Sequence, residues 1–184
     1  MADEFPRSDP AVTPESPEVS SPSRKGMLVV YHGDGAGKES AALGVLFRAH
    51  GRELPVRHVR FDDTRLDDPD GDDLALQKLG IPSDVIGEPG ANGADPLWNC
   101  AAHHMSAMNE GVIVLEGLLD AVTKGWLSAR NVADTFAHDD SLLHIIVTGR
   151  KPVPEIVEIA DLVSNMRAVK QRDANSPAIA GIDY

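Results

Sequence analysis

The chain has 184 residues, 42% of them hydrophobic, and a formal net charge of -12, which fits one domain with an appended tail better than two domains. The acidic surface argues against nucleic acid and membrane surfaces as partners, because it repels phosphate backbones and anionic lipid. The single cysteine, Cys100, excludes an internal disulfide, and no apolar run approaches the ~20 residues that cross a bilayer. We therefore expect a cytoplasmic protein.

The first 23 residues differ in composition from the rest of the chain. They are rich in proline, serine and acidic side chains and carry few large apolar groups. Such a segment cannot bury enough surface to offset the entropy lost on ordering. We expect residues 1–23 to form a disordered acidic tail and residues 24–184 to form the folded domain.

Apolar runs alternate with helical patterns along the rest of the chain. The apolar runs predict strands at residues 27–31, 56–61, 112–115, 142–148 and 161–163. Helical spacing predicts helices at residues 40–50, 74–79, 97–108, 129–136 and 154–160. Strands that are apolar along their whole length are buried on both faces, as in a parallel sheet covered by helices. The sequence therefore predicts a doubly wound α/β domain with a mostly parallel sheet of five or six strands.

An acidic stretch separates the second and third predicted strands. It contains Asp62, Asp63, Asp67, Asp68, Asp70, Asp72 and Asp73. A solvated loop accounts for it, because like charges repel one another and stay in water. The alternative is a divalent-ion site, although the spacing matches no calcium-loop pattern. The glycines of residues 87–93 then predict a flexible connection to Trp98.

A glycine-rich segment follows the first predicted strand and opens the first predicted helix. It reads Gly33-Asp34-Gly35-Ala36-Gly37-Lys38-Glu39-Ser40. Glycines in this place let backbone N–H groups close around phosphate at a helix N-terminus, and Lys38 would add a positive charge. The pattern G-x-x-x-x-G-K-[ST] is missed twice, by His32 at its first glycine and by Glu39 at its magnesium-binding hydroxyl. A tight strand-to-helix turn is the alternative interpretation.

Motifs in both halves of the chain carry a family resemblance. Residues 24–38, followed by Ala41-Ala-Leu-Gly44 and Arg48-Ala49, resemble the opening of the corrinoid adenosyltransferases of the P-loop type, whose loop reads T-G-N-G-K-G-K-T-T before A-A-x-G and R-A. The second half follows the same family's order of motifs. Its matching segments are residues 112–122, 124–127, 148–150, 154–163, 166, 169–170 and 181–184.

The resemblance implies a P-loop NTPase-like domain that forms a cytoplasmic homodimer. Members of this family transfer the 5′-deoxyadenosyl group of ATP to the reduced cobalt of a corrinoid in cobalamin biosynthesis or salvage. ATP, Mg²⁺ (or Mn²⁺) and cobalamin or a precursor are the implied ligands. By position, the implied nucleotide-binding residues are Gly33, Asp34, Gly35, Ala36, Gly37, Lys38, Glu39, Ser40, Arg48 and Arg150.

The chain departs from the family pattern at the residues that carry the chemistry. Ala36 replaces a loop lysine, Glu39 replaces the magnesium-binding threonine, and Glu116-Gly117 replaces an Asp-Glu pair. One hypothesis is that Glu39 and Glu116 hold Mg²⁺ jointly. The other is a catalytically impaired relative that binds nucleotide or corrinoid and acts on a partner, such as an active paralogue. Trp98 either faces the corrinoid or is an ordinary core aromatic.

One further cluster lies within a predicted helix. Cys100, His103 and His104 occur at spacings that place them on one helix face. Thiol and imidazole groups so placed could bind Zn²⁺ or contact cobalt. The sequence offers no evident fourth ligand, and ordinary helix residues are the simpler explanation of the cluster.

Overall fold

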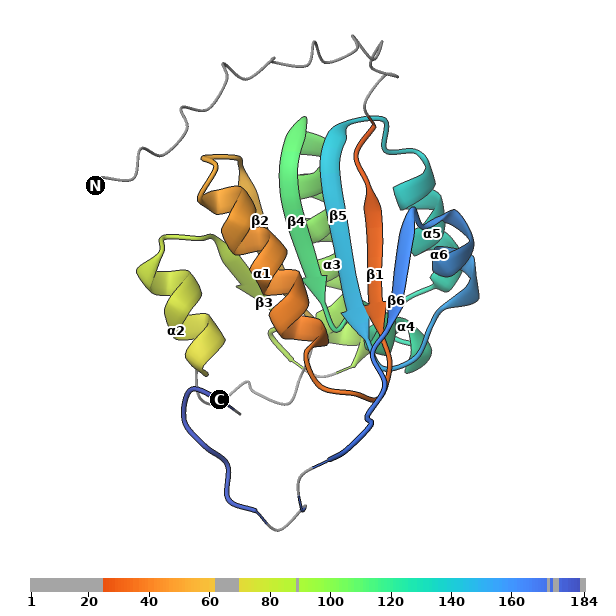
Figure 1. Cartoon of the computed structure of the whole chain (residues 1–184). Coiled ribbons are helices and arrows are strands. Elements are labelled where there is room, and N and C mark those ends of the chain that lie inside the picture. Colours follow the sequence, from red (N-terminus) through yellow and green to blue (C-terminus); the bar gives the residue numbers. More distant parts are fainter. Residues whose placement is uncertain (1–24, 62–69, 89, 172, 174–175, 183–184) are drawn as a thin grey trace, which may run out of the picture.

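The protein folds around one parallel β-sheet. The computed structural model describes residues 25–61, 70–88, 90–171, 173 and 176–182. Within them, six strands pair in parallel in the order β3-β2-β4-β5-β1-β6 (Figure 1). The predicted fold class is therefore confirmed, with six strands. The tail predicted over residues 1–23 lies outside the described residues.

Helices and strands alternate along most of the chain. The strands are β1 Leu28–His32, β2 Val56–Arg60, β3 Ser83–Val85, β4 Glu110–Glu116, β5 Leu142–Gly149 and β6 Leu162–Asn165. The helices are α1 Lys38–His50, α2 Gly71–Lys78, α3 Ala91–Ala107, α4 Leu118–Thr123, α5 Ala129–Ala137 and α6 Pro154–Ile159. None of the helices in the described part is long and apolar enough to span a bilayer.

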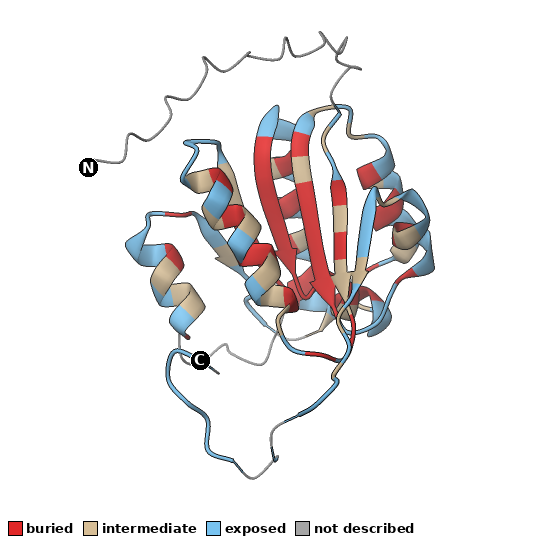
Figure 2. Ribbon diagram, viewed as in Figure 1, coloured by how far each residue is buried: buried red, intermediate tan, exposed pale blue. Residues whose placement is uncertain are grey.

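Two hydrophobic clusters hold the helices on the two faces of the sheet. Val112 and Val114 of β4 pack with α1 and α2, whereas Ile113 and Leu115 pack with the helices of the other face. β4 is consequently buried on both faces, as Figure 2 shows. This double burial is the reason why the strand is a continuous apolar run in the sequence.

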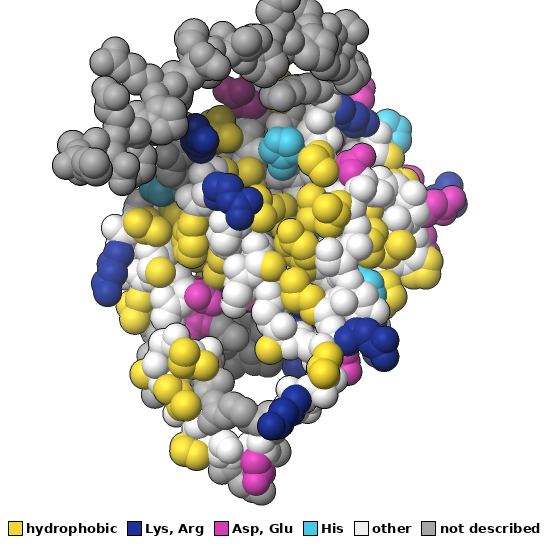
Figure 3. Space-filling model, viewed as in Figure 1, with side chains coloured by type: hydrophobic (Ala, Val, Ile, Leu, Met, Phe, Trp, Pro, Cys, Tyr) yellow, Lys and Arg dark blue, Asp and Glu magenta, His cyan; other side chains and the backbone are white. Residues whose placement is uncertain are grey.

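The face of the molecule that carries α1 has a mixed surface. Figure 3 shows Lys and Arg side chains scattered among hydrophobic ones on this face, without a continuous basic patch among the described residues.

Two sequence expectations about the fold were wrong, and two elements were missed. The connection expected to be flexible at residues 87–93 already includes the start of α3 at Ala91. A Cβ on Gly93 would lie 1.9 Å from the Glu88 carbonyl oxygen, so this glycine permits a close contact and does not loosen the chain. Strand β3 and helix α4 were not predicted at all.

The second wrong expectation concerns the end of the acidic stretch. Asp70 caps α2 by accepting a hydrogen bond from the Asp73 N–H, and the Asp73 side chain accepts one from the Asp70 N–H. This reciprocal pair is a capping box, which satisfies two N–H groups at the start of the helix. Asp70 is buried, so it is not part of a solvated loop. Residues 62–69 lie outside the described residues.

Candidate functional site at the carboxyl edge of the sheet

The glycine-rich loop connects β1 to α1 and is fixed to the segment that follows β6. The Gly35 N–H donates to the Met166 carbonyl oxygen at 2.8 Å, and the Met166 N–H donates to the His32 carbonyl oxygen at 2.7 Å. Gly33 has φ 126° and Gly37 has φ 100°, in the left-handed region that favours glycine. The loop conformation therefore depends on glycine at these two positions.

Lys38 is the first residue of α1 and folds back into the loop. Its Nζ donates to the Gly35 carbonyl oxygen at 2.8 Å, and the residue is only 7% exposed. A buried ammonium group is costly unless it is compensated, and a carbonyl oxygen carries no full charge. The positive end of the α1 dipole lies at the same place. An anionic group bound in the loop would supply the missing negative charge.

The other residues predicted in the loop differ in their surroundings. Asp34 and Ala36 are exposed at its tip, and Asp34 Oδ1 accepts a long hydrogen bond of 3.5 Å from the Ala168 N–H. Glu39 is half-buried in the first turn of α1, and Ser40 is exposed one residue later. All of them share one short segment, so the structure keeps the predicted loop set together.

The two predicted arginines lie in different places. The Arg150 carbonyl oxygen accepts the Gly33 N–H at 3.1 Å, so its backbone adjoins the loop. The Arg150 N–H in turn donates to Asp120 Oδ1 at 3.0 Å. Arg48 is exposed in the last turn of α1, about 15 Å along the helix from Lys38. Its approach to a nucleotide stays a prediction, and the geometry favours Arg150 of the two.

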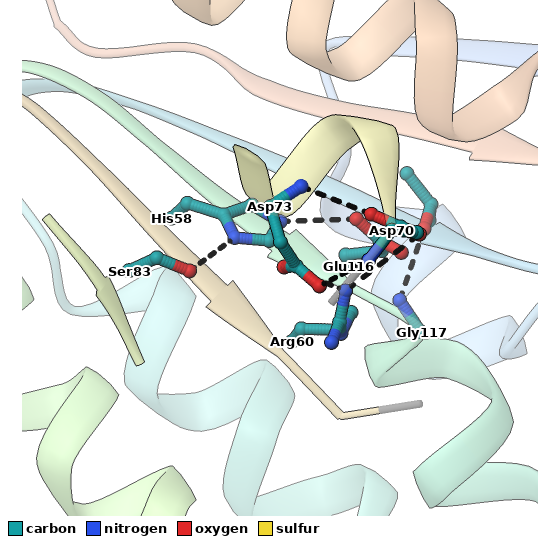
Figure 4. A network of polar contacts seen from close by, with 8 residues as sticks. His58, Arg60, Asp70, Asp73, Ser83, Glu116 and Gly117 are labelled. Carbon is teal, nitrogen blue, oxygen red and sulfur yellow. Dashed lines mark hydrogen bonds and ion pairs between the residues drawn. The ribbon is translucent and has the colours of Figure 1, made fainter. Parts of the chain in front are cut away.

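Glu116 ends β4 at the same edge of the sheet and lies in a buried polar network (Figure 4). Its Oε2 lies 3.0 Å from His58 Nε2, and His58 Nδ1 lies 2.9 Å from Ser83 Oγ. Glu116 is 4% exposed and His58 is 1% exposed. The next residue, Gly117, donates its N–H to Thr148 Oγ1 of β5 at 3.0 Å. One carboxylate oxygen of Glu116 is therefore held firmly.

The buried residues His58 and Arg60 of this network were not singled out from the sequence. β2 reads Val56-Arg-His-Val-Arg60, and polar side chains in a strand expected to be buried are the signal that could have found them. Arg60 is 3% exposed and pairs with Glu116 in the β2–β4 register. Its guanidinium lies 2.8 Å from Asp73 Oδ1 and 3.9 Å from Asp70 Oδ2. The network thus joins β2 and β4 to the start of α2.

Trp98 packs within the core on the other face of the sheet. Its ring meets that of Phe136 edge to face, with centroids 5.9 Å apart. Partly buried, it lies against the cluster formed by the helices of that face. These contacts match the core-aromatic interpretation, and a corrinoid-facing role stays a prediction.

The fold and the loop define a doubly wound parallel α/β protein in which a glycine-rich loop joins the strand β1 to the helix α1. The chain belongs to the ATP:corrinoid adenosyltransferase BtuR/CobO/CobP family, which matches residues 24–184. The resemblance inferred from the motifs is thereby confirmed. It is a family of transferases.

Individual relatives match over most of their own length. The chain is 28% identical to a corrinoid adenosyltransferase of Pseudomonas aeruginosa over 173 residues, which cover 87% of this chain and 84% of the relative. It is 28% identical to the corrinoid adenosyltransferase of Escherichia coli K12 over 169 residues, with 87% and 86% covered. The corrinoid adenosyltransferase CobA of Salmonella typhimurium is 27% identical over 169 residues, with the same coverage.

Replacing Gly33 with alanine should dislodge the loop. The new Cβ would lie 2.1 Å from the Met166 carbonyl oxygen, at a φ that alanine adopts only with strain. We expect the free energy of unfolding to fall by about 3 kcal/mol, measured by urea denaturation. Gly44→Ala is the matched control, because nothing lies within 4 Å of its added Cβ and alanine favours a helix interior. Equal stability of the two variants would contradict the structural role of Gly33.

Proposed function

We propose that the protein transfers the 5′-deoxyadenosyl group of ATP to the reduced cobalt of a corrinoid, cobalamin or a precursor, in cobalamin biosynthesis or salvage. The supporting observation is Lys38, a buried cation folded into a glycine loop at the start of α1 in a chain of this family. In this reaction cobalt(I) attacks the ribose C5′, a cobalt–carbon bond forms, and the C5′–oxygen bond breaks. The triphosphate leaves with the electron pair of that bond.

The protein needs no nucleophile of its own for this transfer. Its task is to hold the triphosphate, balance the charge that leaves with it, and keep C5′ near the cobalt. We assign phosphate binding to Lys38, to Ser40 and to loop N–H groups other than those of Gly33 and Gly35, which donate to the Arg150 and Met166 carbonyl oxygens. Arg150 would approach the same ligand, and the contact of its backbone with Gly33 supports this assignment.

The residues at this edge are compatible with Mg²⁺. Mg²⁺ takes oxygen ligands and is often bound by one or two carboxylates together with substrate phosphates. His58 holds Glu116 Oε2, which leaves Oε1 as a ligand in an oriented carboxylate. Glu39 occupies the family's threonine position and would be the second ligand. The ion would neutralise negative charge on the triphosphate.

The charge of Glu39 makes a metal ion more necessary here than in the family pattern. A carboxylate about 4 Å from a phosphate charge costs about 4 kcal/mol at an effective dielectric constant of ~20. A divalent cation between the two groups converts this repulsion into two attractions. Turnover should therefore depend steeply on Mg²⁺ or Mn²⁺.

We also propose a cytoplasmic homodimer, as the family resemblance implies. β6 is an edge strand, and its Leu162 and Val163 are each 40% exposed. Apolar side chains on a sheet edge suit a self-complementary contact. Analytical ultracentrifugation measures the oligomeric state directly.

The proposed reaction is tested with purified protein, ATP, Mg²⁺ or Mn²⁺, and chemically reduced cobalamin. We expect the absorbance change of the adenosylated product, in proportion to enzyme concentration. Absence of turnover with either metal, in protein shown to be folded by circular dichroism, would overturn the proposal. Calorimetric binding of ATP without turnover would instead identify the impaired relative that binds nucleotide and acts on a partner.

A further inference from the structure

A second cluster of ligand-type side chains lies on the face of the sheet opposite α1. Asp84 comes from the edge strand β3, and Cys100 and His104 come from α3, one helical turn apart. One ligand atom from each residue lies within 4.8 Å of the other two. All three residues are partly buried. The sequence indicated Cys100, His103 and His104 as possible ligands. The fold adds Asp84 to this set and leaves His103 outside the cluster.

The three groups converge on one atom. Cys100 Sγ lies 3.2 Å from His104 Nε2, and Asp84 Oδ2 also lies 3.2 Å from His104 Nε2. A nucleophilic triad would place the thiol and the carboxylate on different ring nitrogens. Here both approach the same nitrogen. This arrangement is typical of ligands around a shared ion and not of a proton relay.

The distances suit a tetrahedral zinc ion. With Zn–S of about 2.3 Å and Zn–N and Zn–O of about 2.0–2.2 Å, tetrahedral ligand atoms lie roughly 3.3–3.6 Å apart. The two separations of 3.2 Å are shorter than this by a few tenths of an ångström, and the third, between Cys100 and Asp84, is at most 4.8 Å. Small side-chain rotations would therefore open the cluster enough to admit the ion.

The surroundings leave the donor atoms available. Burial and the nearby Arg57 cation lower the pKa of His104, against an opposing effect of the Asp84 carboxylate. A metal ion binds the lone pair of the neutral ring. Arg57 donates to Asp84 Oδ2 at 2.8 Å and orients the carboxylate. That oxygen keeps a second lone pair. The positive charge of Arg57 weakens cation binding but does not block the ligand atom.

We propose that Asp84, Cys100 and His104 bind one Zn²⁺ ion, with a fourth position open to water. The thiolate and the carboxylate together balance the two charges of the ion, and the thiol proton is released on binding. The ion would join the edge strand β3, which pairs only through β2 in the described sheet, to helix α3. The site is separate from the loop at Lys38 and does not depend on the proposed transfer reaction.

The test is a calorimetric titration of metal-free protein with Zn²⁺ in the absence of ATP and corrinoid. We expect one ion per chain for the wild type. Cys100→Ser, His104→Gln and Asp84→Asn should each weaken binding at least about tenfold. His103→Gln is the matched control, since this neighbouring histidine lies outside the cluster, and it should bind zinc like the wild type.

Co²⁺ provides a readout that does not rely on variants folding. Substitution of Co²⁺ into the wild type should produce the thiolate-to-cobalt charge-transfer absorption, which requires Cys100 as a ligand. Absence of zinc binding to the wild type, or absence of this absorption, would overturn the proposal. So would a loss of affinity in His103→Gln equal to that in His104→Gln.

Discussion

Lys38→Ala should lower kcat/KM for adenosyl transfer by about 10²- to 10³-fold, or roughly 3–4 kcal/mol of transition-state stabilisation. The loop would lose the ammonium group that lies buried within it, 2.8 Å from the Gly35 carbonyl oxygen. Negative charge on the triphosphate grows as the C5′–oxygen bond breaks. If Lys38 acts on that growing charge as proposed, kcat should fall as well as ATP affinity. Steady-state assays at saturating reduced cobalamin separate the two effects.

Two variants make the Lys38 measurement specific. Lys38→Arg keeps a positive charge but cannot occupy the same small space, so it should recover only part of the activity. Lys151→Ala removes an exposed cation beside Arg150 at the same edge and should change kcat/KM less than twofold. Unfolding curves show whether Lys38→Ala remains folded. A folded Lys38→Ala variant with wild-type kcat/KM would exclude the loop as the triphosphate site.

The parallel sheet could be predicted because its central strands are buried on both faces. β4 carries apolar residues at consecutive positions, and this pattern has few other interpretations. β3 could not be predicted in the same way, because Ser83-Asp84-Val85 is short, polar and mostly exposed at the edge. It becomes a strand only by pairing with β2. α4 was missed because its apolar residues directly follow those of β4, with only Gly117 at φ 71° marking the change.

Some residues of the candidate site are close to one another in the sequence, whereas others are brought together only by the fold. The glycine-rich loop is local, since its glycines and Lys38 are close in sequence and their spacing predicts that they lie together. The partners of Glu116 are not local. His58 lies 58 positions away from Glu116, and Ser83 lies 25 positions away from His58. Only the strand order β3-β2-β4 brings these side chains together, and the same order brings Asp84 to the α3 pair.

His58→Leu should lower the free energy of unfolding by about 3 kcal/mol. The variant leaves the Glu116 carboxylate, which is only 4% exposed, without the ring nitrogen that now lies 3.0 Å away. In a domain of this size such a loss corresponds to a fall in Tm of roughly 6–12 °C. Ser83→Ala removes the other hydrogen bond of the same ring and should cost only about 1 kcal/mol.

The double variant His58→Leu/Glu116→Leu tests whether the cost of His58→Leu comes from the unpaired carboxylate. It should be more stable than His58→Leu alone, because replacing both members of a buried pair by apolar groups leaves no charge to desolvate. A double variant no more stable than the single one would show that the two side chains are not coupled.

If His58 also orients Glu116 for Mg²⁺, then His58→Leu should raise the Mg²⁺ concentration for half-maximal turnover about 10- to 100-fold. Ser83→Ala should raise it less, because it leaves the contact between His58 and Glu116 in place. An unchanged Mg²⁺ requirement in folded His58→Leu would confine the pair to a structural role.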